Sequence, residues 1–183
     1  MINPMKKIII IGNSGAGKST LALKLHQITG LPLVHLDQHY WKAGWVASDK
    51  ATWKAQVEQF IQKDHWIMDG NFRGTMDIRI AAADTIIYLD RSRWVCLYRV
   101  LKRTTRYYRK TRPDVTEGCH ERFDWHFICY IFFFNSRRKP GILKRVRNLK
   151  PHQQLFILRS NRAIKKFLRM QVLAPPPLPK KRL

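Results

Sequence analysis

Eight consecutive residues near the start of the chain have the types and the spacing that bind phosphate groups. They read Gly12-Asn13-Ser14-Gly15-Ala16-Gly17-Lys18-Ser19 and match the P-loop pattern G-x-x-x-x-G-K-[ST]. Glycines let backbone N–H groups turn inward around phosphate oxygens, and the start of a helix adds partial positive charge. We expect Lys18 to reach the β- and γ-phosphates and Ser19 to offer its hydroxyl to Mg²⁺. The stretch therefore predicts a site for ATP and Mg²⁺ that extends to Thr20.

This loop needs a strand before it and a helix after it, and the flanking residues predict both. Residues 8–11 are four isoleucines, which is typical of a buried strand. After the loop, Leu21, Leu25 and Ile28 recur at helical spacing, and Gly30 stands where a helix ends. A glycine-rich turn that merely precedes a helix is the alternative, and this context disfavours it.

Three further apolar runs each end in an aspartate. Because helices separate the runs, we expect parallel strands joined by right-handed crossovers. In such α/β sheets, ligands bind beyond the carboxyl ends of the strands, so all three carboxylates should lie on the P-loop side. The runs and their aspartates are residues 33–36 with Asp37, residues 65–68 with Asp69, and residues 85–89 with Asp90.

These carboxylates are candidates for metal binding and for proton transfer. A P-loop enzyme needs a carboxylate to hold Mg²⁺, and either Asp69 or Asp90 can supply it. We favour Asp69 because Gly70 leaves room for a phosphate beside it. We expect Asp37 to orient or deprotonate the hydroxyl of an acceptor. The alternative for each aspartate is that it caps the following turn.

A basic helix follows the last of these runs, and we expect it to extend from Ser92 to about residue 110. Arg99, Arg103 and Arg106 are spaced i, i+4 and i+7, so they share one face. Because the helix follows a strand end near the P-loop, Arg99 or Arg103 could stabilise the transition state as an arginine finger in cis. A solvated basic face is the alternative for this pattern.

Three aromatic residues are concentrated in the loop after Asp37. Tyr40, Trp41 and Trp45 could stack on a nucleobase or form the floor of a substrate pocket. They could equally fill the core beneath the helix expected from Ser48 or Asp49 onward. The sequence leaves both interpretations open.

Length and composition indicate an ordinary globular enzyme domain. The chain has 183 residues, of which 45% are hydrophobic, enough to bury a core in one domain. Its three cysteines lack the C-x-x-C spacing of redox or zinc sites, which favours a reducing, cytoplasmic location. The apolar runs are too short for a signal peptide or a membrane span, so we expect no membrane partner.

Positive charge is concentrated in the second half of the chain. The net charge is +23, but residues 1–90 carry only +2, whereas residues 91–150 carry +13 and residues 151–183 carry +8. Such a field attracts nucleotide phosphates, nucleic acid or an anionic surface. Net charge does not decide among these partners.

The remaining patterns complete the expected organisation. We expect helices at about 121–134 and 142–149, a strand at 155–158, and a last helix from Ser160 to about residue 170. Residues 1–172 then form one P-loop kinase-like domain, with a lid or basic insertion at about 91–150. Residues 173–183 are rich in proline and lysine, which predicts a disordered tail.

With these residues assembled, the chain resembles the small P-loop kinase-like proteins related to adenylate kinase. More narrowly, it resembles those catalogued as DNA topology modulation proteins of the FlaR type. The resemblance implies a five-stranded parallel sheet in the order 2-3-1-4-5, helices on both faces of the sheet, and a mobile helical lid after strand 4. The matching segments are Gly12–Ser19, His35-Leu36-Asp37, Tyr40 to Trp45, Trp66 to Phe72, Ile87 to Asp90 with Arg93, Leu97 to Val100, Glu121 to Trp125, and Leu158-Arg159-Ser160.

The resemblance also bears on the acceptor. Asp69-Gly70 would occupy the place of the Asp-Gly that follows strand 3 in adenylate kinases. The chain departs from their Asp-Gly-Phe-Pro-Arg continuation and has Asp-Gly-Asn-Phe-Arg instead. The resemblance therefore does not fix AMP as the acceptor.

Two functions remain, and they belong to different classes. The motifs favour an ATP-dependent phosphotransferase that acts on a nucleotide or another small acceptor. The basic half favours a nucleic-acid-associated P-loop ATPase or regulator, although we find no motif that reads base edges. Nucleic acid binding, if present, should then be non-specific, and the oligomeric state does not follow from the sequence.

Overall fold

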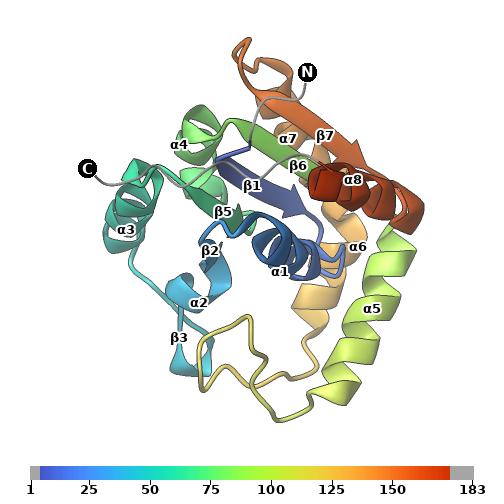
Figure 1. Cartoon of the computed structure of the whole chain (residues 1–183). Coiled ribbons are helices and arrows are strands. Elements are labelled where there is room, and N and C mark those ends of the chain that lie inside the picture. Colours follow the sequence, from blue (N-terminus) through green and yellow to red (C-terminus); the bar gives the residue numbers. More distant parts are fainter. Residues whose placement is uncertain (1–4, 174–183) are drawn as a thin grey trace.

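The computed structural model describes residues 5–173, in which a five-stranded parallel sheet lies between layers of helices (Figure 1). Its strands are β1 (Lys7–Gly12), β2 (Leu33–His35), β5 (Trp66–Asp69), β6 (Thr85–Leu89) and β7 (Gln154–Leu158). They are arranged in the order β2-β5-β1-β6-β7. Counted along the chain, this is the expected order 2-3-1-4-5. The labels differ because a small antiparallel hairpin, β3 (Trp41–Lys42) with β4 (Val46–Ala47), comes between β2 and β5.

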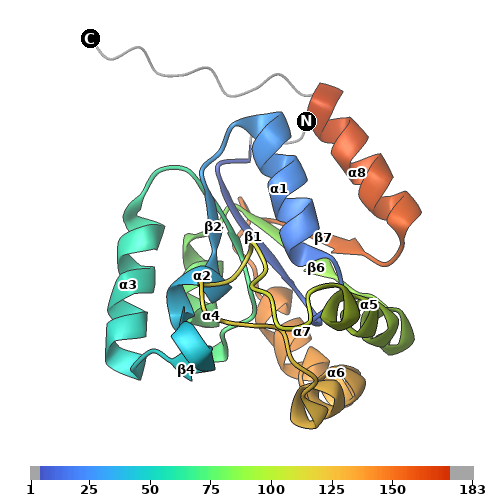
Figure 2. The same cartoon turned by 90° about the horizontal axis from the view of Figure 1, so that it is seen from below.

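Helices cover both faces of the sheet, as the sequence predicts, and Figure 2 shows α1 and α8 together on one side. The longer helices are α1 (Lys18–Thr29), α3 (Lys50–Gln62), α4 (Arg73–Ala82), α5 (Arg93–Arg106), α6 (Trp125–Arg137), α7 (Lys139–Arg147) and α8 (Asn161–Leu173). A short helix, α2 (Leu36–Tyr40), connects β2 to the hairpin.

The four isoleucines of β1 explain why this strand is central. Ile8 and Ile10 pack into the core beneath α1 and α8, whereas Ile9 and Ile11 pack into the core beneath α3, α4 and α7. All four are fully buried. Because successive side chains of a strand point to opposite faces, a central strand of a covered sheet must be apolar at every position. Each buried isoleucine contributes about 1.5–3 kcal/mol relative to its exposed state.

Local capping fixes where several helices begin. Asp49, rather than Ser48, caps α3 by accepting from the backbone N–H groups of residues 51 and 52, both at 2.9 Å. Ser160 caps α8 as expected, accepting from Ala163 at 3.0 Å. Asp124 caps α6 by accepting from Phe127 at 3.1 Å, so this helix begins at Trp125 and not at 121. The basic helix α5 ends at Arg106, earlier than the sequence predicts.

Residues 107–124, here called the strap, lie between α5 and α6 without forming a regular helix or strand. The yellow segment in Figure 1 shows the strap passing beneath α2 and β3. Its contacts with residues 38–45 are mainly hydrogen bonds to backbone carbonyl groups, which fix the strap against the hairpin. They are Gln38 Nε2 to the Pro113 carbonyl (2.7 Å), the Gly44 N–H to the Gly118 carbonyl (3.0 Å), Trp45 Nε1 to the His120 carbonyl (2.9 Å), and the Thr116 hydroxyl to the Trp41 carbonyl.

Two predictions, the disordered tail and the lid, are not tested by the described residues. The expected tail lies outside the described residues except for Leu173, which is the end of α8. The division into one domain with a lid at 91–150 stays a prediction, although α5, α6 and α7 all pack into the cores on the sheet. Within residues 5–173, no helix combines the length and the apolar character that a membrane span requires.

Candidate nucleotide and acceptor site

A cleft of about 1530 Å³ opens at the carboxyl edge of the sheet. The P-loop and α1 form one wall, the β5–α4 loop and α6 form another, and α5 and the strap close a third side. Among the residues that line it are Lys18, Ser19, Asp37, Tyr40, Arg99, Arg103, Asp114 and Tyr130. The structure therefore brings the predicted P-loop, one of the predicted aspartates and two of the predicted arginines to one cavity.

The P-loop backbone adopts conformations that favour glycine. Gly15 and Gly17 have φ angles of +78° and +100°, which side-chain-bearing residues rarely adopt. A Cβ atom on Gly15 would also lie 2.4 Å from the carbonyl oxygen of Cys96, because α5 packs directly against the loop. Asn13 is buried beneath the loop and donates to the Ile131 carbonyl at 2.9 Å. The loop is thus held from below by α6 and from the side by α5.

Lys18 and Ser19 both face the cleft. Burial lowers the pKa of the Lys18 ammonium, and the charges of Asp37 and Asp69 partly offset this effect. In the structure, Lys18 Nζ donates to the Asn13 carbonyl at 3.2 Å. The ammonium is therefore a partly desolvated charge, for which a phosphate group would be a stronger partner than one carbonyl.

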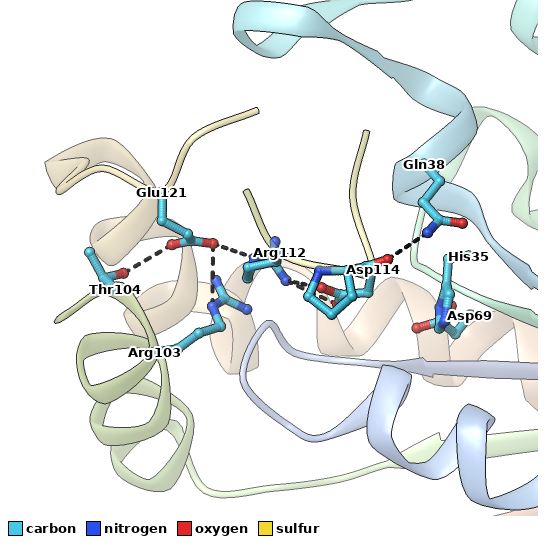
Figure 3. Close-up of polar contacts among 9 residues, drawn as sticks. His35, Gln38, Asp69, Arg103, Thr104, Arg112, Asp114 and Glu121 are labelled. Atoms are coloured by element: carbon cyan, nitrogen blue, oxygen red, sulfur yellow. Dashed lines mark hydrogen bonds and ion pairs between the residues drawn. The ribbon is translucent and has the colours of Figure 1, made fainter. Parts of the chain in front are cut away.

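Asp37 and Asp69 occupy different positions around Lys18. Asp37 lies in the first turn of α2 and lines the cleft, and burial together with the nearby charge of Asp69 raises its pKa. Asp69, at the end of β5, is buried, and its Oδ1 lies 2.6 Å from His35 Nδ1 (Figure 3). Burial alone would lower the pKa of His35, but the hydrogen bond and charge of Asp69 outweigh it and raise the pKa. Of this pair, His35 lines the cleft.

Asp90, the second candidate for the magnesium carboxylate, takes part in structural ion pairs. Its Oδ1 lies 2.7 Å from Lys139 Nζ at the start of α7, and its Oδ2 lies 3.3 Å from Arg159 Nε beyond β7. These contacts connect three successive parts of the chain at the sheet edge. The geometry gives Asp90 two cationic partners, whereas Asp37 faces the open cleft.

The arginines of α5 separate into two kinds. Arg99 Nη1 donates to the Ala16 carbonyl at 3.3 Å, and its Nη2 donates to Asn161 at 3.1 Å, so this side chain spans the P-loop and α8. Arg103 also lines the cleft, and burial lowers its pKa. Arg106, predicted to share their face, packs instead over the ring of Tyr107 with its Cζ 5.9 Å from the ring centroid.

A buried cluster of charges, which no sequence pattern indicated, holds the strap to α5. Glu121 accepts from Thr104 at 3.2 Å, lies 3.4 Å from Arg103 Nε, and lies 2.5 Å from Arg112 Nε (Figure 3). Arg112 also donates to both oxygens of Asp114, at 2.8 and 3.0 Å. Burial would raise the pKa of Asp114, but Arg112 and a hydrogen bond from Ser19 lower it. The strap thus brings a carboxylate to the P-loop serine.

Asn71 and Arg79 hold the β5–α4 loop, and they too were missed. The Asn71 carboxamide donates to the Gly12 carbonyl at 2.9 Å and accepts from the Gly12 N–H at 3.1 Å. Arg79 is fully buried, and its guanidinium donates to the carbonyls of Gly70 at 3.0 Å and Asn71 at 2.7 Å. Burial lowers the pKa of Arg79 to about 10. A Gly-Asn pair such as Gly70-Asn71 is typical of a turn, but no sequence pattern connects Arg79 to it.

The aromatic loop packs into the core and also lines the cleft. The Tyr40 ring packs against Trp53 and Phe72, with centroid distances of 5.2 and 4.7 Å, and so extends the core. Tyr40, Trp41 and Trp45 also line the cleft, and the two tryptophan rings meet edge to face at 5.6 Å. One end of the cleft is therefore aromatic, and the other is the P-loop.

The residues present fit a magnesium–nucleotide complex. Mg²⁺ prefers oxygen ligands and is usually held by one or two protein oxygens together with phosphates and water. Ser19 and Asp37 supply such oxygens on the cleft wall. Among the described residues, no three His, Cys, Asp or Glu side chains gather as a metal site.

Comparison with known proteins defines the class of fold. No protein-family model and no curated protein sequence matches the chain. Solved structures do match, and they show that the chain has the fold of P-loop kinases. A shikimate kinase from Acinetobacter baumannii in complex with shikimate has a TM-score of 0.56 at 13% identity, covering 92% of this chain and 93% of that one.

Two other kinases of different specificity match equally completely. A deoxyadenosine kinase from M. mycoides with bound dATP has a TM-score of 0.54 at 14% identity, covering 91% of this chain and 99% of that one. A gluconokinase from Sinorhizobium meliloti 1021 has a TM-score of 0.51 at 14% identity, covering 92% and 90%. Because these identities are low, the matches establish the fold alone. The narrower relationship to FlaR-type proteins stays a prediction.

Proposed function

We propose that the protein is an ATP-dependent phosphotransferase that transfers the γ-phosphoryl group to a hydroxyl of a small acceptor. The observation that carries this proposal is the convergence of Lys18, Ser19, Asp37 and the arginines of α5 on one cleft. Phosphoryl transfer depends on positioning and on stabilising charge, and these residue types supply both.

Each residue has a role that its position supports. The P-loop N–H groups and Lys18 would bind the β- and γ-phosphates, and the partly desolvated ammonium would make this contact strong. Asp37 would orient or deprotonate the acceptor hydroxyl, since its raised pKa makes it a better proton acceptor than an ordinary aspartate. Arg99 and Arg103 would stabilise the charge of the transferring group.

For Mg²⁺, we propose Ser19 as the direct protein ligand. The bound ion would neutralise charge on the β- and γ-phosphates. Asp37 is a carboxylate on the cleft wall that could supply a second oxygen, whereas Asp69 can do so only if the His35 ring turns away from it.

The acceptor would occupy the aromatic end of the cleft. Tyr40, Phe72 and Tyr130 form apolar walls there, and His35 and Asn71 are polar groups between them. Such a pocket suits a ring-bearing acceptor such as a nucleoside, a nucleotide or a cyclic polyol. Among the structures with this fold are a deoxyadenosine kinase and a shikimate kinase, so the fold accommodates acceptors of both kinds. An adenylate kinase-like reaction belongs to this range.

The test is a screen of nucleosides, nucleoside monophosphates and small hydroxyl compounds, scored by ADP release. We expect Lys18→Ala to abolish turnover and to weaken MgATP binding about 100-fold in calorimetry, because a charge-assisted contact in a desolvated cradle is lost. Lys54→Ala, which removes an exposed lysine of α3, is the matched control. Unchanged ATP affinity in folded Lys18→Ala protein would remove the site from the P-loop. Turnover that requires DNA and no small acceptor would favour the ATPase alternative.

A further inference from the structure

The outer face of α5 and α6 carries exposed aromatic rings beside arginines. Trp94 and Tyr98 are 66% and 64% exposed, and they lie one turn apart on α5. Trp94 packs edge to face against Phe132 of α6, with ring centroids 5.5 Å apart, and Phe132 meets Phe133 in the same way at 5.1 Å. We call these four residues the aromatic ridge. A group of exposed large aromatic side chains on a protein surface marks a binding surface.

Arginines cover parts of this ridge and leave the rest open. Arg93 Cζ lies 5.0 Å from the Phe132 ring centroid, and Arg137 Cζ lies 4.7 Å from that of Phe133. Neither arginine has an ion pair among the residues that the structure describes. Their positive charge is therefore available to an external anion, while the rings beside them hold the guanidinium groups in place.

Carboxylates are absent from the sequence of the helices that form and flank this face. The four acidic residues of segment 91–150 all lie between positions 114 and 124, so α5, α6 and α7 contain none. In the structure, Asp114 and Glu121 are paired with Arg112 at the cleft. The aromatic ridge consequently lies in a positive field with little local compensation.

We propose that the aromatic ridge binds single-stranded nucleic acid. Its backbone phosphates would contact Arg93 and Arg137, and its unpaired bases would stack on Trp94 and Tyr98. Exposed rings interleaved with cations are the combination that binds single strands without sequence preference. A duplex keeps its bases stacked inside, so it would use the charges but not the rings. The four rings and Arg93 do not line the cleft proposed for phosphotransfer, whereas Arg137 lies between the ridge and that cleft and also lines it. The proposal does not depend on the proposed function.

Two other occupants fit the observations less well. A second copy of the chain would bring two like-charged faces together, which the charge of α5, α6 and α7 opposes. A membrane surface would favour a helix with a broad aliphatic face. On α5, the exposed large apolar residues are Trp94, Tyr98 and Leu101, and only the last is aliphatic.

The experiment is fluorescence anisotropy with the full chain and three probes: a labelled 20-nucleotide oligothymidylate, a 20-base-pair duplex, and phosphatidylserine vesicles. We expect the single strand to bind more tightly than the duplex, with a slope of about −0.7 in log K against log salt for each phosphate contacted. Trp94→Ala and Tyr98→Ala should each weaken single-strand binding about ten-fold, and Trp94→Phe should retain it. The loss should be much smaller for the duplex.

Matched controls separate stacking from charge and from stability. Met170→Ala removes an exposed apolar side chain of α8 and is the control for Trp94→Ala and Tyr98→Ala. Lys166→Gln removes one charge of α8 and is the control for Arg93→Gln. Both controls should bind the single strand like wild type. The proposal is overturned if neither nucleic acid binds, or if duplex and single strand bind equally and Trp94→Ala changes nothing. It is also overturned if vesicles bind more tightly than oligothymidylate. A concentration-dependent dimer that Trp94→Ala abolishes would overturn it in favour of a second copy of the chain.

Discussion

The P-loop and the strap both line one cleft and are held there by different forces. The P-loop takes its shape from its own glycines and from the buried strand beside it, all within a few residues of sequence. The strap depends on one buried charge cluster and on hydrogen bonds to a hairpin about 75 residues away. The backbone conformation of the P-loop is thus set mainly within its own sequence, with α5 and α6 packed against it, whereas the strap is held by long-range polar contacts. The strap should therefore be loosened by single substitutions that leave the P-loop intact.

The largest effect should come from the arginines that connect the two sides. If Arg99 or Arg103 stabilises the transition state, its replacement by alanine should lower kcat by about 10³-fold. Arg106→Ala is the control, because it removes the same side chain from the same helix outside the cleft. Single-turnover kinetics with saturating MgATP and acceptor would measure the step. Equal rates for all three variants would show that α5 takes no part in the chemistry.

A substitution in the strap should separate its stability from that of the rest of the molecule. Glu121→Gln leaves Arg103 and Arg112 without their shared carboxylate, and removal of one partner from a buried ion pair costs about 3 kcal/mol. We expect amide hydrogen exchange in residues 107–124 to accelerate accordingly, while exchange in β1 stays slow. Glu117→Gln removes an exposed carboxylate of the same segment and should change neither. Strap protection that survives in Glu121→Gln would mean that the hairpin contacts alone hold it.

The two aspartates near Lys18 should differ in which step they affect. Asp37→Asn should lower the rate of transfer to the acceptor by about 10²-fold and leave MgATP affinity nearly unchanged. Asp69→Asn should weaken Mg²⁺-dependent turnover and also release His35. Titration of Mg²⁺ against turnover, together with calorimetry of MgATP, distinguishes the two. Lost ATP affinity with an unchanged acceptor rate in Asp37→Asn would contradict the roles proposed here.

The smallest effect concerns pH. His35 has a raised pKa in the folded protein, so its pairing with Asp69 stabilises the fold fully below the unfolded pKa and loses this contribution as pH rises through the folded value. His39 has a pKa lowered chiefly by burial and contributes with the opposite sign. The measurement is therefore the difference in urea stability between wild type and His35→Gln. We expect that difference to shrink from pH 6 to pH 8, and a constant difference would exclude the ion pair.

The features that the sequence predicted correctly depend on residues that are close together in the chain. Local sequence patterns predict such features because each acts within a few residues. They are the isoleucines of β1, the glycines of the P-loop, and the caps at Asp49 and Ser160. The sheet order, which the family resemblance implied, agrees with the structure. The arginine face of α5 was predicted from spacing alone, and two of its three members line the cleft.

The features that the sequence did not predict depend on contacts between residues that are not close neighbours in the chain. Nothing about Glu121 indicates that it will lie between Arg103 and Arg112, because the strap that positions it has no periodicity. The same is true of the buried guanidinium of Arg79, which binds carbonyls of a loop seven to nine residues earlier. The pairing of Asp69 with His35 needed the register of β2 on β5. Polar side chains at these places carry no hydrophobic pattern that would reveal their partners.

The contact between Gly15 and α5 sets a mechanical limit on how the cleft can open. The position of a Cβ on Gly15 lies 2.4 Å from the Cys96 carbonyl and 2.9 Å from Val100, so the first half of α5 rests directly on the P-loop. That half therefore has to travel with the loop as one rigid body. A movement that lifts the strap would therefore have to occur beyond Val100, in the second half of α5 and residues 107–124. The strap would then be the part that moves, while the first half of α5 stays with the P-loop.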